Sequence, residues 1–392
     1  MNTLPWSRPE PFGAWVRLDD ATLLAVDAPT ATRLGVPSGR AIGLVSRPLE
    51  LHVAVTARCP AACAGCYLDA RPDGHEPTFA EIAERLAEAR EAGVSTVAFG
   101  GGEPLTRADL GRVAEEARRL GLLPVVTTSG IGLSAARAED LRAFAQINVS
   151  HDGVGGAYEA VRGYAGEPGA ERAIALLVAA GIPTGVNVVL TRRSFPHLGE
   201  TAARVASLGA GEIQLLRYKP AGRADQPEEY AAARLGREQR SSLWPSIEAL
   251  VARRDLRVRI DCAMVPLISE GLLARGPDPA KRLARLGVFG CEAARHLGAL
   301  TVAGDTAACS FLGARPADVI ALGRGPRASV ARTWDEDRGL AALRAYHAAP
   351  PEPCASCALF AVCRGGCQVV SRSTSGGAFA PDPECPRVEA LR

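Results

Sequence analysis

Short apolar runs alternate with amphipathic stretches through the middle of the chain. Apolar runs of strand length occur at 50–56, 95–100, 123–128, 147–150, 184–190 and 212–217. Between them the apolar positions follow helical spacing, at 78–92, 107–120, 134–144, 168–181 and 196–208. Thr78 and Glu81 form a capping box at the start of the first of these helices. Because strands that alternate with helices are joined by right-handed crossovers, this pattern predicts an α/β fold with a parallel sheet.

The flanking segments follow other patterns. Residues 14–26 predict two short strands around an Asp19-Asp20 turn, which we expect to cap the α/β region as an edge hairpin. A substrate-docking piece is the alternative for this segment. Beyond the alternating region, the sequence predicts a helix at 237–254, a strand at 257–262, and a short helix from Trp334 to Tyr346.

Composition excludes several classes of protein. The 392-residue chain is 47% hydrophobic with a net charge of +2, so it buries a core and lacks a basic field for nucleic acid. No apolar run approaches about 18 residues and no signal sequence is present, so we expect a cytoplasmic protein without a membrane partner. The chain has 11 cysteines but no closely spaced pair among its 6 histidines. In a reducing compartment these cysteines indicate thiolate-bound metal rather than disulfides.

Three cysteines directly follow the first strand of the alternating region. Cys59, Cys63 and Cys66 have the spacing C-x3-C-x2-C. Three thiolates on one short loop can hold three irons of a cubane 4Fe–4S cluster. The fourth iron then has no protein ligand and is free to bind a small chelating molecule. The alternative is three unrelated buried cysteines.

This loop resembles the cluster loop of the radical S-adenosylmethionine (SAM) enzymes. The resemblance implies that the amino and carboxylate groups of SAM bind the open iron, and that reduction of SAM yields a 5′-deoxyadenosyl radical. Gly101-Gly102-Glu103, after the second strand, resembles the family motif that holds the SAM amino group. Glycines permit close approach of a ligand, and a carboxylate accepts from an ammonium. The resemblance further implies a partial (β/α)6 barrel with its chemistry at the C-terminal strand ends.

Other polar residues at strand ends are SAM contacts that the resemblance implies. Ser129 follows the third strand, Ser150 ends the fourth, and Asn187 lies in the fifth. Arg162 matches the arginine that grips the SAM carboxylate, a role that suits its bidentate fork. A solvated charge at a helix end is the alternative for Arg162. His151 is expected to be a wall residue rather than a base.

The aromatic contact to adenine departs from the family pattern. Many relatives place an aromatic residue directly before the third cysteine, where this chain has Gly65. Tyr67, which follows Cys66, is therefore the candidate for stacking on adenine. Residues 214–224 resemble the strand and turn that pack against the adenine in relatives.

A second cysteine pattern occupies about the last hundred residues. Its spacing is C-x12-G-x4-C, then C-x2-C-x5-C-x3-C, then a final C, which resembles the SPASM domain of radical SAM enzymes that act largely on peptides and proteins. Seven thiolates suit two multi-iron clusters better than a tetrahedral zinc ion. The resemblance implies an outer auxiliary 4Fe–4S cluster on Cys354, Cys357, Cys363 and Cys385. It implies an inner one on Cys291, Cys309 and Cys367, which has an open iron unless Cys262 or the substrate fills it.

Two further residues bear on the reaction. Cys262, in an apolar strand, is a core residue, a fourth ligand of the inner cluster, or a hydrogen-atom donor to a substrate radical. The branch of the family that activates sulfatases has an aspartate base after the second SPASM cysteine, and Ser310 stands there in this chain. That substitution argues against sulfatase activation.

The sequence therefore predicts a radical SAM/SPASM oxidoreductase. We expect a hairpin cap at 1–47, a barrel at 48–285 and a SPASM domain at 286–392. The expected cofactors are SAM, its 4Fe–4S cluster and two auxiliary 4Fe–4S clusters, reduced by an external flavodoxin- or ferredoxin-type donor. The expected substrate is a ribosomally made peptide that is crosslinked, oxidised or epimerised. The alternative is epimerisation or dehydrogenation of a small molecule, such as an aminoglycoside-like sugar or a tetrapyrrole.

Overall fold

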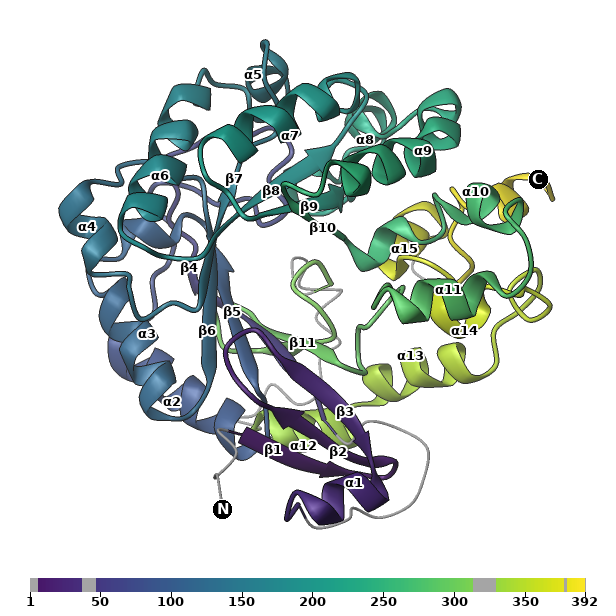
Figure 1. The fold of residues 1–392 in the computed structure, drawn as a ribbon, viewed down its shortest axis with the longest axis horizontal. Helices are drawn as coiled ribbons and strands as arrows, with labels where there is room; N and C mark the ends of the chain where they lie inside the picture. Colours follow the sequence, from purple (N-terminus) through teal and green to yellow (C-terminus); the bar gives the residue numbers. More distant parts are fainter. Residues whose placement is uncertain (1–5, 37–46, 313–328, 377–378, 392) are drawn as a thin grey trace.

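A curved, nine-stranded sheet forms the centre of the protein (Figure 1). The structure is a computed structural model, and it describes residues 6–36, 47–312, 329–376 and 379–391. The sheet contains β4 (Glu50–Thr56), β5 (Thr96–Gly101), β6 (Leu123–Thr128), β7 (Gln146–Ser150), β8 (Thr184–Leu190), β9 (Glu212–Arg217), β10 (Arg257–Ile260), β11 (Leu297–Leu300) and β12 (Thr306–Ala307). Its order is β10-β9-β8-β7-β6-β5-β4-β11-β12, and among these described strands only the β11–β12 pair is antiparallel. The six predicted strands β4 to β9 are therefore confirmed, as is the α/β class.

Helices cover the outer face of the sheet (Figure 1). They are α2 (Phe79–Glu91), α3 (Leu110–Arg119), α4 (Ala135–Glu139), α5 (Ala157–Arg162), α6 (Glu167–Ala179), α7 (Leu198–Ser207), α8 (Pro227–Ala233) and α9 (Arg237–Arg253). The predicted capping box is present at α2, where Thr78 and Glu81 bond each other's backbone N–H groups. Helix α4 ends at Glu139, before the predicted end at residue 144, because the chain turns there to enter β7.

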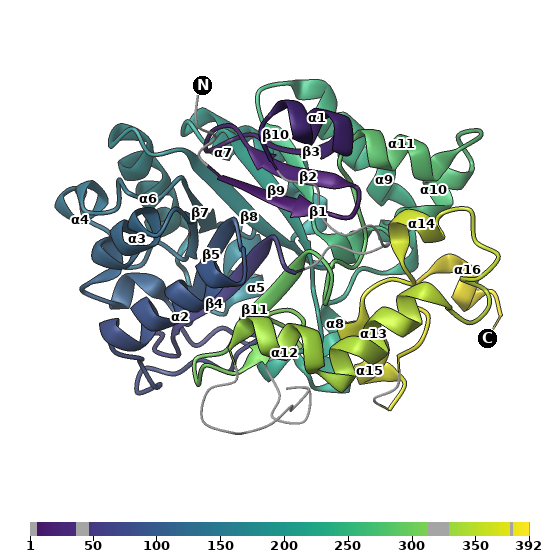
Figure 2. The same ribbon diagram turned by 90° about the horizontal axis from the view of Figure 1, so that it is seen from below.

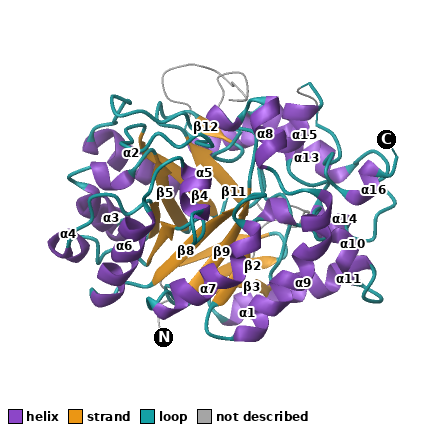
Figure 3. Ribbon diagram, turned by 90° about the horizontal axis from the view of Figure 1, so that it is seen from above, coloured by secondary structure: helices purple, strands orange, loops and turns teal. Residues whose placement is uncertain are grey.

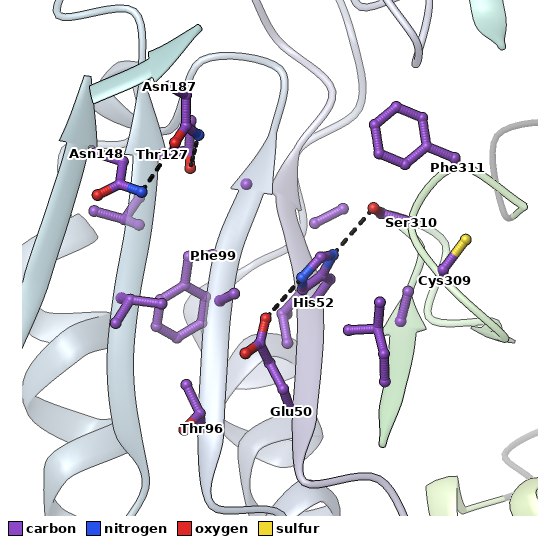
Figure 4. A pocket seen from close by; sticks show the side chains of 18 of the residues that line it. Glu50, His52, Thr96, Phe99, Thr127, Asn148, Asn187, Cys309, Ser310 and Phe311 are labelled. Carbon is purple, nitrogen blue, oxygen red and sulfur yellow. Dashed lines mark hydrogen bonds and ion pairs between the residues drawn. The ribbon is translucent and has the colours of Figure 1, made fainter. Parts of the chain in front are cut away.

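The burial pattern of β4 explains how the strand faces are divided. Leu51, Val53 and Val55 are almost fully buried against the helices. Glu50 and His52 alternate with them and point to the inner side of the sheet, where they line a cavity (Figure 4). The alternation of side chains along β4 thus puts Leu51, Val53 and Val55 toward the helices and Glu50 and His52 toward the inside of the barrel.

The sheet extends beyond the six predicted strands at both edges. Strand β10 adds in parallel to β9, and it ends at Ile260, two residues before the predicted end. Strand β11 adds in parallel to β4, with Ala299 opposite His52. Because β11 belongs to the region expected to form the C-terminal domain, the barrel and that region share one sheet.

The N-terminal segment forms a small separate sheet, shown in purple in Figure 2. It contains β1 (Trp6–Glu10), β2 (Gly13–Arg17) and β3 (Leu23–Asp27), followed by α1 (Ala28–Arg33). The predicted hairpin around Asp19-Asp20 is β2–β3, whereas β1 was not predicted. Arg8 donates to Gly93 O at 2.8 Å, and Arg17 donates to Ser95 O at 3.0 Å. These carbonyls precede β5, so the small sheet docks at the N-terminal ends of the barrel strands.

The C-terminal helices are α10 (Ser269–Leu273), α11 (Pro279–Arg285), α12 (Val330–Glu336), α13 (Arg338–Ala348), α14 (Phe360–Cys363), α15 (Gln368–Thr374) and α16 (Pro386–Glu389). All except α12 gather on the side of the sheet away from α2, α3, α4 and α6 (Figure 3), whereas α12 packs against α2. The single helix predicted from Trp334 to Tyr346 is wrong. Asp337 has extended backbone angles and caps α13 by accepting from the N–H groups of Gly339 and Leu340, so the chain forms two helices there. Among the described residues, no helix is both long and apolar enough to span a membrane.

Candidate active site

The three-cysteine loop lies at the C-terminal end of β4. Cys59, Cys63 and Cys66 are all partly exposed and interact electrostatically with one another. Backbone bonds shape the loop: Cys59 N–H donates to Arg71 O at 2.9 Å, and Cys66 N–H donates to Cys63 O at 3.2 Å. The structure thus brings the three predicted thiols together at the strand end where the sequence places them.

The two glycines of the Gly-Gly-Glu motif make room for this loop. A Cβ on Gly101 would lie 2.2 Å from Thr56 O, and one on Gly102 would lie 2.1 Å from Arg58 O. Gly102 N–H donates to Thr56 O at 2.7 Å. We expected these glycines to admit a ligand, but the contact that requires them is between β5 and the start of the cysteine loop. The motif therefore fixes the loop to its neighbouring strand.

Glu103 connects the ends of β5 and β6. Its side chain is 2% exposed, and its carboxylate accepts from the Ser129 N–H at 2.7 Å and from the Ser129 hydroxyl at 2.5 Å. It also accepts from the Thr128 hydroxyl and from Leu105 N–H. These partners are all hydrogen-bond donors, and the negative charge of Glu103 contributes to raising the pKa of Cys59. Glu103 is therefore held as a carboxylate-type acceptor beside the cysteine loop, and Ser129 lies with it.

Arg162 lies beside Cys63 of the loop. Its Nε donates to Asp152 Oδ2 at 2.6 Å, and Asp152 Oδ1 accepts from Val189 N–H at 2.7 Å. Burial raises the pKa of Cys63, whereas the nearby Arg162 charge lowers it. Asp152 thus orients a guanidinium toward the cysteine loop. His151, which precedes Asp152, is fully buried and is not among the residues that line the cavity described below.

Arg223 is a contact of the cysteine loop that the sequence pattern did not single out. It lies in the 3-10 turn Gly222–Ala224 after β9, and its Nε donates to Cys63 O at 2.8 Å. Its backbone N–H donates to Cys66 O at 2.8 Å, and Nη1 pairs with Asp69 at 2.9 Å. A Cβ on Gly222 would lie 2.5 Å from Cys66 O, so this turn packs directly on the cysteine loop. A glycine-arginine pair after the sixth strand was the available signal.

Asn187 has the polar partners that a buried amide requires. Its Oδ1 accepts from Asn148 at 3.0 Å, and its Nδ2 donates to Thr127 at 3.2 Å (Figure 4). Ser150 is buried and lies opposite Asn187 in the β7–β8 register. Ser150 thus ends β7, and Asn187 lies in the middle of β8, beside the ends of β6 and β7.

Aromatic rings fill the space beside the cysteine loop. A Cβ on Gly65 would lie 2.7 Å from the Tyr218 ring, so Tyr218 takes the volume that an aromatic side chain at position 65 would need. Tyr67 packs on Phe311 with ring centroids 4.6 Å apart, and Lys219 Nζ lies 4.2 Å from the centroid of Phe311. Tyr67 therefore connects the loop to the C-terminal region.

A cavity of about 990 Å³ extends between the barrel and the C-terminal region. Tyr67, Asn187 and Gly101 line it from the barrel, and four cysteines line it from other elements: Cys262, Cys291, Cys309 and Cys367. Cys262 interacts electrostatically with Cys291 and Cys367. The structure therefore adds Cys262 to the three inner cysteines that the sequence pattern grouped.

Lys219 and Asp261 form an ion pair beside Cys262 in this cavity. Burial raises the pKa of Asp261, but the charge and the hydrogen bond of Lys219 lower it by a larger amount. The carboxylate is therefore ionised. Lys219 also interacts with Cys309 and Cys367. One cation thus offsets negative charge on several thiolates.

The remaining C-terminal cysteines form a separate group. Cys354, Cys357, Cys363 and Cys385 line a small cavity under α14 and α16. Between the two groups lies Asp382, which accepts from Cys367 N–H at 2.9 Å and pairs with Arg217 at 2.6 Å. The seven cysteines of the second pattern therefore separate in space into four and three.

The donor chemistry of all three groups fits iron–sulfur clusters. Burial raises the pKa of Cys59, Cys291 and Cys354, so their thiolate forms require a cationic partner, which iron supplies. The cysteines do not converge closely enough to share a single ion. Among the described residues, the one close group of possible single-ion ligands is His151, Glu167 and Glu171.

Comparison with known proteins is consistent with this site. Residues 53–205 match the sequence model of the radical SAM superfamily. PqqA peptide cyclase from Streptomyces rochei is 29% identical over 87% of this chain and 90% of its own length. Mycofactocin maturase MftC from Mycolicibacterium smegmatis is 29% identical over 86% of this chain and 82% of its own length.

Solved structures share the fold. Streptococcus suis SuiB bound to precursor peptide SuiA has a TM-score of 0.77 at 16% identity and covers 98% of this chain and 100% of its own. Native anSMEcpe with bound AdoMet and Cp18Cys peptide has a TM-score of 0.60 at 17% identity, and it covers 87% of this chain and 95% of its own. A radical SAM domain implies a 4Fe–4S cluster and SAM as cofactors. With its three-cysteine loop at the end of β4 in a partial parallel barrel, this chain contains a radical SAM domain at residues 53–205.

Proposed function

We propose that the protein is a radical SAM peptide maturase, which crosslinks, oxidises or epimerises a residue of a ribosomally made peptide. The observation that carries this proposal is the cavity of about 990 Å³, which the inner cysteines line together with Tyr67, the residue that follows Cys66. It has the volume of a site for several amino-acid residues, at the upper end of ordinary small-ligand pockets. The names of the relatives and of the SuiB–SuiA complex, which concern peptides, support the same substrate class.

The chain's own residues bind and orient the reactants. Cys59, Cys63 and Cys66 would hold the 4Fe–4S cluster. With SAM bound, that cluster would supply the radical chemistry that removes a hydrogen atom from the substrate. Glu103 offers a buried carboxylate for an ammonium group, and Arg162 offers a guanidinium for a carboxylate. Tyr67 and Tyr218 exclude water and provide ring faces beside the loop.

The C-terminal cysteines would hold two auxiliary 4Fe–4S clusters. The outer set is Cys354, Cys357, Cys363 and Cys385, and the inner set is Cys291, Cys309 and Cys367. Their separation into two groups supports this division. Within the proposal the barrel spans 48–285 and the SPASM region spans 286–392, and an external flavodoxin- or ferredoxin-type protein in the cytoplasm supplies the electron.

Formation of 5′-deoxyadenosine tests the proposal. The enzyme is reconstituted anaerobically, supplied with SAM and dithionite, and offered size-fractionated extract of its host. A fraction that raises 5′-deoxyadenosine above the extract-free background, and loses this effect after protease treatment, supports peptide maturation. Stimulation by a small, protease-resistant fraction would instead assign a small-molecule substrate. Turnover that persists after Cys59, Cys63 and Cys66 are all changed to Ala would overturn the radical assignment.

A further inference from the structure

One wall of the cavity carries a hydrogen-bonded chain of hydroxyl, imidazole and carboxylate (Figure 4). Ser310 Oγ lies 3.1 Å from His52 Nδ1, and His52 Nε2 lies 2.9 Å from Glu50 Oε1. Glu50 and His52 are two positions apart on β4, so both project from its inner face. Ser310 comes from the loop after β12. All three residues line the cavity.

The carboxylate determines which way the hydrogen bonds run. Burial raises the pKa of Glu50, but the hydrogen bond with His52 leads the effects that lower it overall, so Glu50 is ionised. An ionised carboxylate only accepts, and therefore His52 Nε2 carries the proton. In the neutral ring Nδ1 is then bare, and it accepts from the Ser310 hydroxyl. The lone pairs of Ser310 Oγ remain available to a donor in the cavity.

The surroundings favour proton transfer over nucleophilic attack. A serine nucleophile needs backbone N–H donors nearby to stabilise the developing oxyanion. The N–H groups that follow Ser310, those of Phe311 and Leu312, are instead directed to the sulfur of Cys309. The three side chains therefore have the hydroxyl–imidazole–carboxylate order of a proton relay. The backbone N–H donors after Ser310, which an acyl-transfer site would direct to an oxyanion, are used by the Cys309 sulfur.

We propose that Ser310, His52 and Glu50 form a proton relay that accepts a proton from an O–H or N–H group of the bound peptide. This inference rests on the proposed function. In the step, the peptide proton moves to Ser310 Oγ while the Ser310 proton moves to His52 Nδ1, and Glu50 stabilises the resulting imidazolium. No electron moves in this step. The peptide residue that gives up this proton can also lose a hydrogen atom, which leaves it as a radical. Oxidation of that radical releases one electron, which requires a one-electron acceptor of the iron–sulfur class.

The relay predicts a separation between SAM cleavage and product formation. In His52→Ala, the purified peptide should still stimulate 5′-deoxyadenosine, whereas modified peptide should form about 100-fold more slowly, the usual contribution of a general base. Added imidazole should restore product formation, because the cavity has room for it once the ring is removed. Ser310→Thr should keep activity and Ser310→Ala should lose it. His197→Ala, at an exposed histidine outside the cavity, is the matched control.

The outcomes distinguish this inference from the proposed function. If no peptide stimulates 5′-deoxyadenosine, the proposed function fails. If His52→Ala lowers 5′-deoxyadenosine and modified peptide in parallel, and added imidazole restores neither, the relay is overturned while the proposed function stands. Diethyl pyrocarbonate, which reacts with neutral imidazole, provides a test without substrate. His52 of the reconstituted enzyme should be modified at pH 7. Failure of His52 to react in both the native enzyme and Ser310→Ala, while His197 reacts, would refute its role as an available base.

Discussion

Replacing Arg217 tests how the barrel is joined to the C-terminal cysteine region. Arg217 ends β9, and its guanidinium lies 2.6 Å from Asp382 and 3.1 Å from Glu384. The side chains of Arg217 and Asp382 are 3% and 1% exposed. Burial lowers the pKa of Arg217, but the charges of Asp382 and Glu384 raise it well above its usual value. Arg217→Met keeps most of the aliphatic volume and removes only the charge and its hydrogen bonds.

The expected loss follows from the burial of the partners. Removal of one member of a buried ion pair leaves an uncompensated charge and costs about 3–5 kcal/mol. For a chain of this size that corresponds to a fall in Tm of roughly 3–10 °C. We would measure Tm of the reconstituted enzyme by anaerobic scanning fluorimetry at a fixed scan rate, together with its iron content. Iron should fall, because Asp382 also accepts from the N–H of Cys367.

Arg204→Met is the matched control for this experiment. Arg204 also binds a carboxylate at 2.6 Å, that of Glu171, but its side chain is 49% exposed. Exposed pairs contribute only about 0–1 kcal/mol, so Tm should change little. Equal Tm values for Arg217→Met and the native protein would refute the reasoning, as would equal losses in the two variants.

Three further outcomes are expected. Gly102→Ala should lower the iron bound at the three-cysteine loop, since its Cβ would lie 2.1 Å from Arg58 O, whereas Gly169→Ala, with no atom within 4 Å, should retain full iron. Iodoacetamide footprinting of the reconstituted enzyme should leave Cys262 unmodified if it is a cluster ligand. Modification of Cys262 alone would assign a free thiol, and deuterium uptake from heavy water that is lost in Cys262→Ala would identify it as the hydrogen donor. Burial lowers the pKa of His347 to about 4, so the unfolded chain alone binds this proton between about pH 6.5 and 4. The free energy of unfolding should therefore decrease as the pH is lowered through that window, by about 1.4 kcal/mol per pH unit. His347→Phe should reduce the decrease measured between pH 7 and pH 5.

The barrel could be predicted because its signals are local. The alternation of strands and helices from β4 to β9 is visible in the periodicity of apolar residues. The Thr78–Glu81 capping box is visible in four consecutive positions of the sequence. The added strand β11 was not predicted. It has four residues, and it is a strand because the open edge of β4 offers partners, with Leu297 opposite Glu50. The break in the helix at Asp337 was also missed, since the apolar spacing continues through it.

The sequence by itself predicted the chemistry of the site. Thiolates at C-x3-C-x2-C and the seven-cysteine pattern indicate iron–sulfur clusters, because ligand type and number are properties of the residues. Tertiary structure decided which groups act together. It brings Cys262 to the inner cysteines and Arg223 to the cysteine loop. It also places Ser310 beside His52 across 258 positions of chain, because β11 pairs with β4. Such contacts depend on how strand edges and loops meet in space, and no local pattern of residues encodes that.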